Sequence, residues 1–168
     1  RQTEEDVKSS GLVWIIGRNG LYIEPDLDFL EQYILAGKIQ NCAANGRCCY
    51  TSRDELANAY VQLLLNDKFN AGTYNLVGPP VTQKQLVDAM NDHFSADLQY
   101  EPIPYMNFKK DRQKGLGEYL GLLVAGLYQA TNNGGLNMQS DFSKIVGRQH
   151  YSLEDMIIKY KLTQFMPS

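Results

Sequence analysis

Residues 9–22 read Ser9-Ser10-Gly11-Leu12-Val13-Trp14-Ile15-Ile16-Gly17-Arg18-Asn19-Gly20-Leu21-Tyr22, and this stretch decides the predicted fold. Residues 3–10 are typical of a helix end, and Gly11 suits a left-handed cap. Leu12 to Ile16 is an apolar run, as expected for a strand with both faces covered. The polar turn that follows, Gly17 to Tyr22, therefore lies at the carboxyl end of a predicted strand. Ligands of open α/β sheets bind at such ends, so we expect this turn to line a crevice.

The rest of the chain alternates strand and helix signals at first and is mostly helical later. Pro25 suits the first turn of a helix that Gly37 ends. Two capping patterns, Ser52 with Glu55 and Thr82 with Gln85, predict helix starts. The other expected elements are a strand at 72–78, a short extended piece at 98–104, an interrupted helical region at 106–132 and a last helix from 152 to 162. The pattern predicts an α/β fold.

Size and charge restrict the class of protein. With 168 residues the chain is predicted to form a single domain, 1–168. A net charge of −3 and a pI near 5.4 argue against nucleic acid or an anionic membrane as the main partner. The longest apolar stretch, Leu116 to Tyr128, is shorter than the roughly 20 residues needed to span a bilayer. We also expect no signal peptide.

The three cysteines, Cys42, Cys48 and Cys49, indicate a reducing compartment. An odd number, two of them adjacent, fits neither a disulfide framework nor a zinc site. The sequence therefore predicts a cytoplasmic protein whose thiols are free and mostly buried. A reactive thiol beside Arg47 is the alternative.

Further motifs extend the pattern of residues 9–22 over nearly the whole chain. They are Ser52-Arg53-Asp54-Glu55-Leu56-Ala57, the strand Thr73 to Gly78, and Asp141-Phe142 followed by Val146-Gly147-Arg148-Gln149 and Ser152. In this order and spacing the sequence resembles the NmrA-like, quinone-oxidoreductase group of atypical, extended short-chain dehydrogenases. The resemblance implies the C-terminal part of a Rossmann-like NAD(P)-binding fold with a mostly helical substrate lobe. The N-terminal glycine-loop unit of the family would lie upstream of Arg1, so we expect this part alone to be inactive.

The resemblance also implies a site. Arg18, Asn19 and Gly20 are predicted to contact the cofactor, NADP or NAD. The substrate wall is predicted to consist of Tyr22, Ile23, Phe29 and Tyr33, because flat acceptors favour aromatic and apolar surroundings. The implied reaction is NAD(P)H-dependent reduction of a quinone-like or other flat small molecule. No catalytic or metal-binding residue is assigned.

Two other functions remain open at this stage. One is a non-catalytic NAD(P)-sensing regulator of the NmrA type, and the other is a relative of the sugar-nucleotide epimerases. For the turn at Arg18 to Tyr22, an ordinary structural role is equally open. We further expect self-association, because a strand at 12–16 without its upstream neighbours would expose an open edge.

Several tempting motifs have simpler explanations. Residues 115–121, Gly-Leu-Gly-Glu-Tyr-Leu-Gly, loosely resemble a dinucleotide fingerprint, but a charged helical run precedes them where a strand is required. We interpret the small residues Gly117, Gly121 and Ala125 as sites of close helix packing. Tyr105 and Lys109 have the Tyr-x-x-x-Lys spacing by chance, since the chain is rich in both residue types.

Isolated polar residues are also interpreted structurally. His93 and His150 have no partner at ligand spacing and are predicted to be structural or surface residues. Glu24, Asp26 and Asp28 resemble a metal or acid–base cluster, but we explain the two aspartates by the positive end of the helix dipole.

Overall fold

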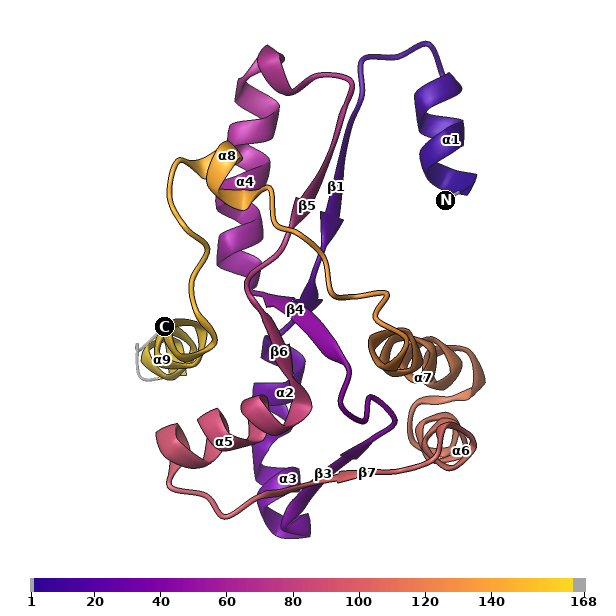
Figure 1. Cartoon of the computed structure of the whole chain (residues 1–168), viewed down its shortest axis with the longest axis vertical. Coiled ribbons are helices and arrows are strands. Elements are labelled where there is room, and N and C mark those ends of the chain that lie inside the picture. Colours follow the sequence, from indigo (N-terminus) through magenta and orange to yellow (C-terminus); the bar gives the residue numbers. More distant parts are fainter. Residues whose placement is uncertain (1, 165–168) are drawn as a thin grey trace.

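The computed structural model describes residues 2–164 and shows an elongated α/β molecule (Figure 1). The helices are α1 (Gln2–Ser9), α2 (Glu24–Asp28), α3 (Leu30–Ala36), α4 (Arg53–Leu65), the 3-10 turn η1 (Asp67–Phe69), α5 (Gln83–Phe94), α6 (Tyr105–Leu116), α7 (Glu118–Asn132), α8 (Phe142–Val146) and α9 (Leu153–Gln164). The strands are β1 (Ile15–Asn19), β2 (Leu21–Tyr22), β3 (Lys38–Asn41), β4 (Arg47–Thr51), β5 (Gly72–Leu76), β6 (Pro80–Thr82) and β7 (Gln99–Pro102).

The strands form three small pairings rather than one wide sheet. β1 runs parallel to β5, with Asn19 opposite Leu76 at the carboxyl ends. β4 lies between β2, which is parallel to it, and β6, which is antiparallel. β3 and β7 form a separate parallel pair. Parallel neighbours require crossovers, and helices supply them, as expected for an α/β fold.

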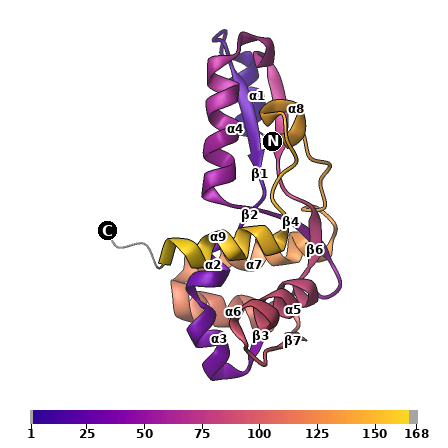
Figure 2. The same ribbon diagram turned by 90° about the vertical axis from the view of Figure 1, so that its left-hand side faces the viewer.

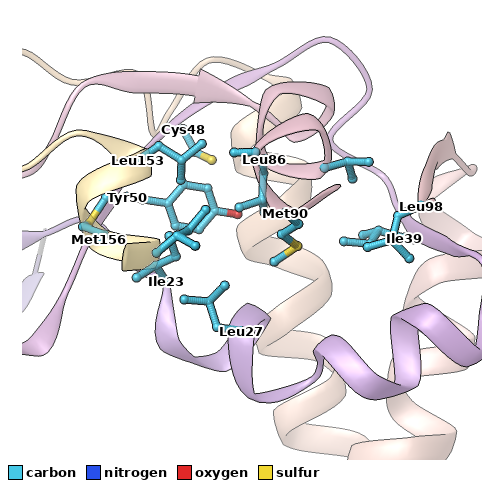
Figure 3. Close-up of a cluster of buried hydrophobic side chains, with 13 residues drawn as sticks. Ile23, Leu27, Ile39, Cys48, Tyr50, Leu86, Met90, Leu98, Leu153 and Met156 are labelled. Atoms are coloured by element: carbon cyan, nitrogen blue, oxygen red, sulfur yellow. The ribbon is translucent and has the colours of Figure 1, made fainter. Parts of the chain in front are cut away.

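Two hydrophobic cores stabilise the two ends of the molecule. In Figure 2, α4 stands beside β1 in the upper half, and α8 lies close by. The core there joins α4, β5 and α8 through Leu56, Leu63, Leu76, Phe142 and Ile145. The lower core joins α2, β4, α5 and α9. Figure 3 shows the ring of Tyr50 among the side chains of this lower core, with Ile23, Leu86 and Leu153 close to it.

Helices α6 and α7 form an antiparallel pair with a small core of their own. Gly121 packs so closely on α6 that a Cβ atom there would overlap the backbone of Gln113. Ala125 is fully buried, and Gly117 joins the two helices with a φ of +83°. Gly115 thus lies within α6, Gly117 between the two helices and Gly121 within α7, and the prediction of close helix packing is confirmed at Gly121 and Ala125.

The first strand begins later than predicted. The expectation of a strand at 12–16 with both faces covered is wrong, since Leu12 and Val13 are 74% and 80% exposed and Trp14 precedes the strand. β1 instead covers 15–19, including three residues predicted as turn. The ladder to β5 sets these bounds, because Gly72, the first residue of β5, pairs with Ile15. Pairing, and not local apolarity, decides where the strand starts.

Most helix ends follow the predicted signals. Gly11 and Gly37 adopt positive φ angles of 74° and 68°. Thr82 and Gln85 form a complete capping box, whereas Ser52 caps α4 without help from the side chain of Glu55. The helix predicted from Pro25 is divided at Phe29 into α2 and α3. Within residues 2–164, every helix is too short or too polar to cross a bilayer.

Candidate functional site

The candidate site lies where the chain passes from one strand pair to the next. β1 ends at Asn19, Gly20 follows, and β2 begins at Leu21 beside β4. Gly20 is buried, and a Cβ atom at this position would overlap the carbonyl oxygen of Cys49. Only glycine lets the two backbones approach this closely. The crossing places residues 19–22 at the carboxyl end of β1, where parallel sheets bind ligands.

The amide of Asn19 organises this end of the strand. Its Nδ2 donates to the hydroxyl of Tyr22 at 3.1 Å, and its Oδ1 accepts from the hydroxyl of Tyr60 at 2.8 Å. Tyr60 comes from α4 and is half-buried. Asn19 thus fixes the position of the Tyr22 ring, which is 42% exposed.

A crevice of about 410 Å3 opens beside these residues, and its surface is mostly apolar. One wall is formed by the chain from β1 to α2, and the other by α7 and the segment after it. The residues that line it are Asn19, Gly20, Leu21, Tyr22, Pro25, Asp26, Val124, Leu127, Tyr128 and Leu136. Such a surface suits a flat, apolar ligand.

At the base of the crevice, one buried carboxyl accepts hydrogen bonds from three phenols. The hydroxyls of Tyr33 and Tyr128 donate to Oδ1 of Asp26 at 3.2 and 3.4 Å, and that of Tyr50 donates to Oδ2 at 3.0 Å. Asp26 is only 7% exposed. Its burial raises the pKa of the carboxyl, and the three phenols oppose that shift. The helix-dipole explanation of Asp26 misses these contacts.

Buried amides extend this cluster away from the crevice. Gln83 donates through Nε2 to the hydroxyl oxygen of Tyr50 at 3.0 Å and accepts from Asn41 at 2.9 Å. Tyr100 in turn donates to Asn41 Oδ1 at 2.9 Å. Burial also raises the pKa of the Tyr50 and Tyr128 hydroxyls, as does the nearby Asp26 carboxyl. Both phenols therefore stay protonated.

A second cavity of about 420 Å3 lies on the other side of Asp26. It shares Pro25, Asp26, Val124 and Tyr128 with the crevice. Its other walls include Phe29 and Tyr33 from the α2–α3 segment and Phe108 and Arg112 from α6. Asp26 and Tyr128 therefore form part of a wall between two cavities.

The three residues predicted to contact the cofactor lie in two different places. Asn19 and Gly20 line the crevice, whereas Arg18 binds Glu4 of α1 through two hydrogen bonds of 2.8 and 2.6 Å. This ion pair lowers the pKa of Glu4 to about 2. Cofactor contact by Arg18 remains a prediction, and it would require this exposed pair to rearrange.

The four residues predicted to form the substrate wall lie in three different places. Tyr22 lines the crevice, and Phe29 and Tyr33 line the second cavity. Ile23 is 1% exposed and belongs to the lower core. The sequence did not reveal the wall formed by α7 or the three phenols around Asp26. No regular sequence spacing could have indicated the three phenols, because Tyr33, Tyr50 and Tyr128 are far apart in the chain.

The cysteines and His150 are structural, as predicted. Burial raises the pKa of Cys48 to about 12 and raises those of Cys42 and Cys49, which contradicts the reactive-thiol alternative. His150 donates from Nδ1 to the carbonyl of Tyr151 at 2.8 Å, and its Nε2 lies 3.0 Å from the Thr51 hydroxyl. Burial lowers the pKa of His150, which keeps the ring neutral.

Comparison by sequence identifies no relative: no protein-family model matches the chain, and no curated protein matches it significantly. Comparison with solved structures is informative. The chain has the fold of Rossmann-like proteins, which confirms the predicted α/β class, and this fold is similar to that of NmrA-like and quinone-oxidoreductase proteins.

Three solved structures illustrate the likeness. An NADPH-dependent quinone oxidoreductase from Escherichia coli, complexed with NADPH, is 23% identical with a TM-score of 0.87, over 95% of this chain and 58% of that one. A nucleoside-diphosphate-sugar epimerase from Staphylococcus aureus is 22% identical with a TM-score of 0.86, over 93% and 56%. A triphenylmethane reductase from Citrobacter sp., complexed with NADP(H), is 24% identical with a TM-score of 0.80, over 94% and 56%. The chain thus spans little more than half the length of these proteins.

The crevice itself fits the ring end of a nicotinamide cofactor or a flat acceptor better than a pyrophosphate. Asn19 and Tyr22 offer an amide and a phenol at the carboxyl end of β1, and the other walls are mostly apolar. None of the residues lining it within 2–164 is a lysine or arginine, and no helix begins with a glycine-rich turn there. A phosphate group would need such donors.

Proposed function

We propose that this chain is the substrate-side part of an NAD(P)H-dependent oxidoreductase that reduces a flat, quinone-like or similarly conjugated acceptor. The observation that carries the proposal is the apolar crevice beside Asn19 and Tyr22, at the carboxyl end of β1 and facing α7. A nicotinamide ring placed there would face an acceptor lying against Tyr22 and the apolar side chains of α7. Two of the similar structures are an NADPH-dependent quinone oxidoreductase and a triphenylmethane reductase, and the aromatic or conjugated molecules in their names support the same chemistry here.

In this proposal the residues of the chain have distinct tasks. Asn19, held by Tyr60, keeps the Tyr22 ring in place at the entrance. Tyr22 and the apolar side chains of α7 exclude water and orient the acceptor by its flat faces. The phosphates would be bound outside the chain described here, by the unit that the family carries upstream. NADP or NAD is the proposed cofactor, and a small molecule is the proposed partner.

The test uses the full-length protein, NADPH and menadione as acceptor. Tyr22→Ala removes aromatic contact of about 0.5–1.5 kcal/mol, so we expect the acceptor KM to rise about two- to tenfold with a smaller change for NADPH. Tyr119→Ala is the matched control, because this tyrosine is 83% exposed and does not line the crevice. Unchanged KM values in Tyr22→Ala would refute the pocket assignment. Cofactor binding without turnover would favour the NAD(P)-sensing regulator instead.

A further inference from the structure

The Asp26 cluster must rearrange its hydrogen bonds when the carboxyl is protonated. With Asp26 ionised, its two oxygens accept the hydrogens of Tyr33, Tyr50 and Tyr128. When the carboxyl takes up a proton, its own O–H must donate to one of these phenol oxygens. The phenol that accepts it must then turn its own hydrogen away from Asp26.

Only two of the three phenols can release that hydrogen toward a cavity. Tyr50 lies in the lower core, is 1% exposed and already accepts from Gln83. Tyr128 lines both the crevice and the second cavity, and Tyr33 lines the second cavity. The phenol that accepts from the protonated carboxyl is therefore Tyr128, whose hydroxyl hydrogen then points toward the crevice, or Tyr33, whose hydroxyl hydrogen then points toward the second cavity.

We propose that Tyr128 delivers a proton to the acceptor bound in the crevice, and that Asp26 supplies the proton which restores Tyr128. The proposal rests on the proposed function, in which a bound nicotinamide would supply a hydride and a carbonyl acceptor would then need a proton on oxygen. The Tyr128 O–H bond breaks as the acceptor O–H bond forms. At the same time the Asp26 O–H bond breaks and the phenol O–H bond of Tyr128 forms again. Asp26 is left ionised and regains its proton through Tyr33 from the second cavity.

The surroundings of the cluster suit this role. Asp26 is contacted by phenols from α3, β4 and α7, and the thiol of Cys48 lies nearby on β4. Arg112 of α6 and Lys38 of β3 also line the second cavity. Burial and the nearby Asp26 carboxyl raise the pKa of Tyr33, and Arg112 opposes this rise. Among the described residues, the Nε of Arg112 is buried without a hydrogen-bond partner. The cation therefore lies on the side from which the proton is regained.

Two acceptors separate proton delivery from reduction. Menadione needs a proton on oxygen, whereas the cation of malachite green takes a hydride at carbon and needs none. In the full-length protein with NADPH, we expect Asp26→Asn and Tyr128→Phe to slow menadione reduction ~100-fold more than dye reduction, a loss typical of general acids. An equal loss of rate with both acceptors, or no loss of rate with menadione, would overturn the proposed proton relay from Asp26 through Tyr128.

Matched controls lie outside both cavities. Tyr74→Phe removes a buried hydroxyl that donates to the carbonyl of Phe69, and Asp141→Asn alters a carboxylate that accepts from the amide of Asn75. Both should leave the ratio of the two rates unchanged.

If the protein reduces neither acceptor, the proposed function is refuted, but the proton relay is not. A measurement without turnover then tests the relay by itself. Infrared difference spectra should show a protonated carboxyl band that persists above the ordinary titration range of aspartate and is missing in Asp26→Asn. Titration of that carboxyl in the ordinary range would overturn the relay, because Asp26 would then hold no proton to give.

Discussion

Arg148 binds both carboxylate oxygens of Glu55, with Nη1 2.9 Å from Oε2 and Nη2 2.5 Å from Oε1. Glu55 is completely buried at the start of α4, and its Oε2 also accepts from the backbone N–H of Tyr151 at 3.0 Å. The pair therefore joins α4 to the segment before α9, 93 residues further along the chain.

Loss of the cation should leave a buried carboxylate without its partner. We expect Arg148→Met to reduce the free energy of unfolding by about 3 kcal/mol, the lower end of the range for buried pairs, because Arg148 is partly exposed. Urea unfolding measures this. Glu4→Gln breaks the exposed pair with Arg18 and should leave the free energy of unfolding nearly unchanged. Similar losses in the two variants would contradict a special role for the Glu55–Arg148 pair.

The stability of the protein should fall as the solution is acidified. Burial lowers the pKa of His150 from 6.5, so the unfolded chain binds a proton more readily, and stability is lost as the pH falls through the ordinary histidine range. Burial alone would raise the pKa of Glu55, but the hydrogen bonds from Arg148 and Tyr151 outweigh it and lower the value from 4.5. Its contribution is therefore lost at lower pH still. Urea titrations from neutral to acid pH should show a shallower decline between pH values of about 7 and 5 in His150→Gln.

Gly20 should not tolerate a side chain. A Cβ atom there would overlap the carbonyl oxygen of Cys49. We expect Gly20→Ala to destabilise the protein by about 1–3 kcal/mol, because the crossing from β1 to β2 would have to shift. Gly126→Ala is the control: a Cβ atom there would meet nothing within 4 Å, and alanine in a helix should add about 0.5–1 kcal/mol. Thermal unfolding of both variants decides the matter, and a harmless Gly20→Ala would disprove the close approach.

The isolated chain of 168 residues should bind NADPH very weakly. Gly115 lies in α6, Gly117 joins α6 to α7 and Gly121 lies in α7, so these glycines do not form the strand-to-helix turn that a pyrophosphate site requires. Calorimetric titration with NADPH tests this expectation. A dissociation constant in the low micromolar range would show that phosphate binding has been missed.

The same isolated chain should self-associate. Leu12, Val13, Leu64 and Leu65 are each at least 74% exposed, and β1 pairs with β5 on one edge only among the described strands. An open edge next to exposed apolar side chains favours pairing with another chain. Sedimentation should therefore reveal species larger than 19.0 kDa. A single monodisperse monomer at high concentration would contradict this prediction.

Local signals in the sequence determined much of the architecture. Gly37 ends α3 because glycine accepts a positive φ, and the Thr82–Gln85 box starts α5 because both side chains satisfy backbone N–H groups nearby. Such signals predicted the α/β class and most of the helices, but strands β2, β3, β4 and β6 were not predicted, because they are short and are defined by their pairing. The sequence also predicted that Asn19, Gly20 and Tyr22 follow a strand and line a crevice, although this strand ends at Asn19 and not at Ile16.

Tertiary structure alone decided the rest. β1 starts at Ile15 because Gly72 of β5 pairs with it, although Leu12 and Val13 are the more apolar residues. Asp26 has the sequence context of an ordinary first-turn aspartate, yet the fold brings Tyr33, Tyr50 and Tyr128 to its carboxyl. Glu55 has the spacing of a capping residue and binds Arg148 instead. In each case the partner lies far away in the sequence, and packing of whole elements, which no local pattern encodes, brings the two together.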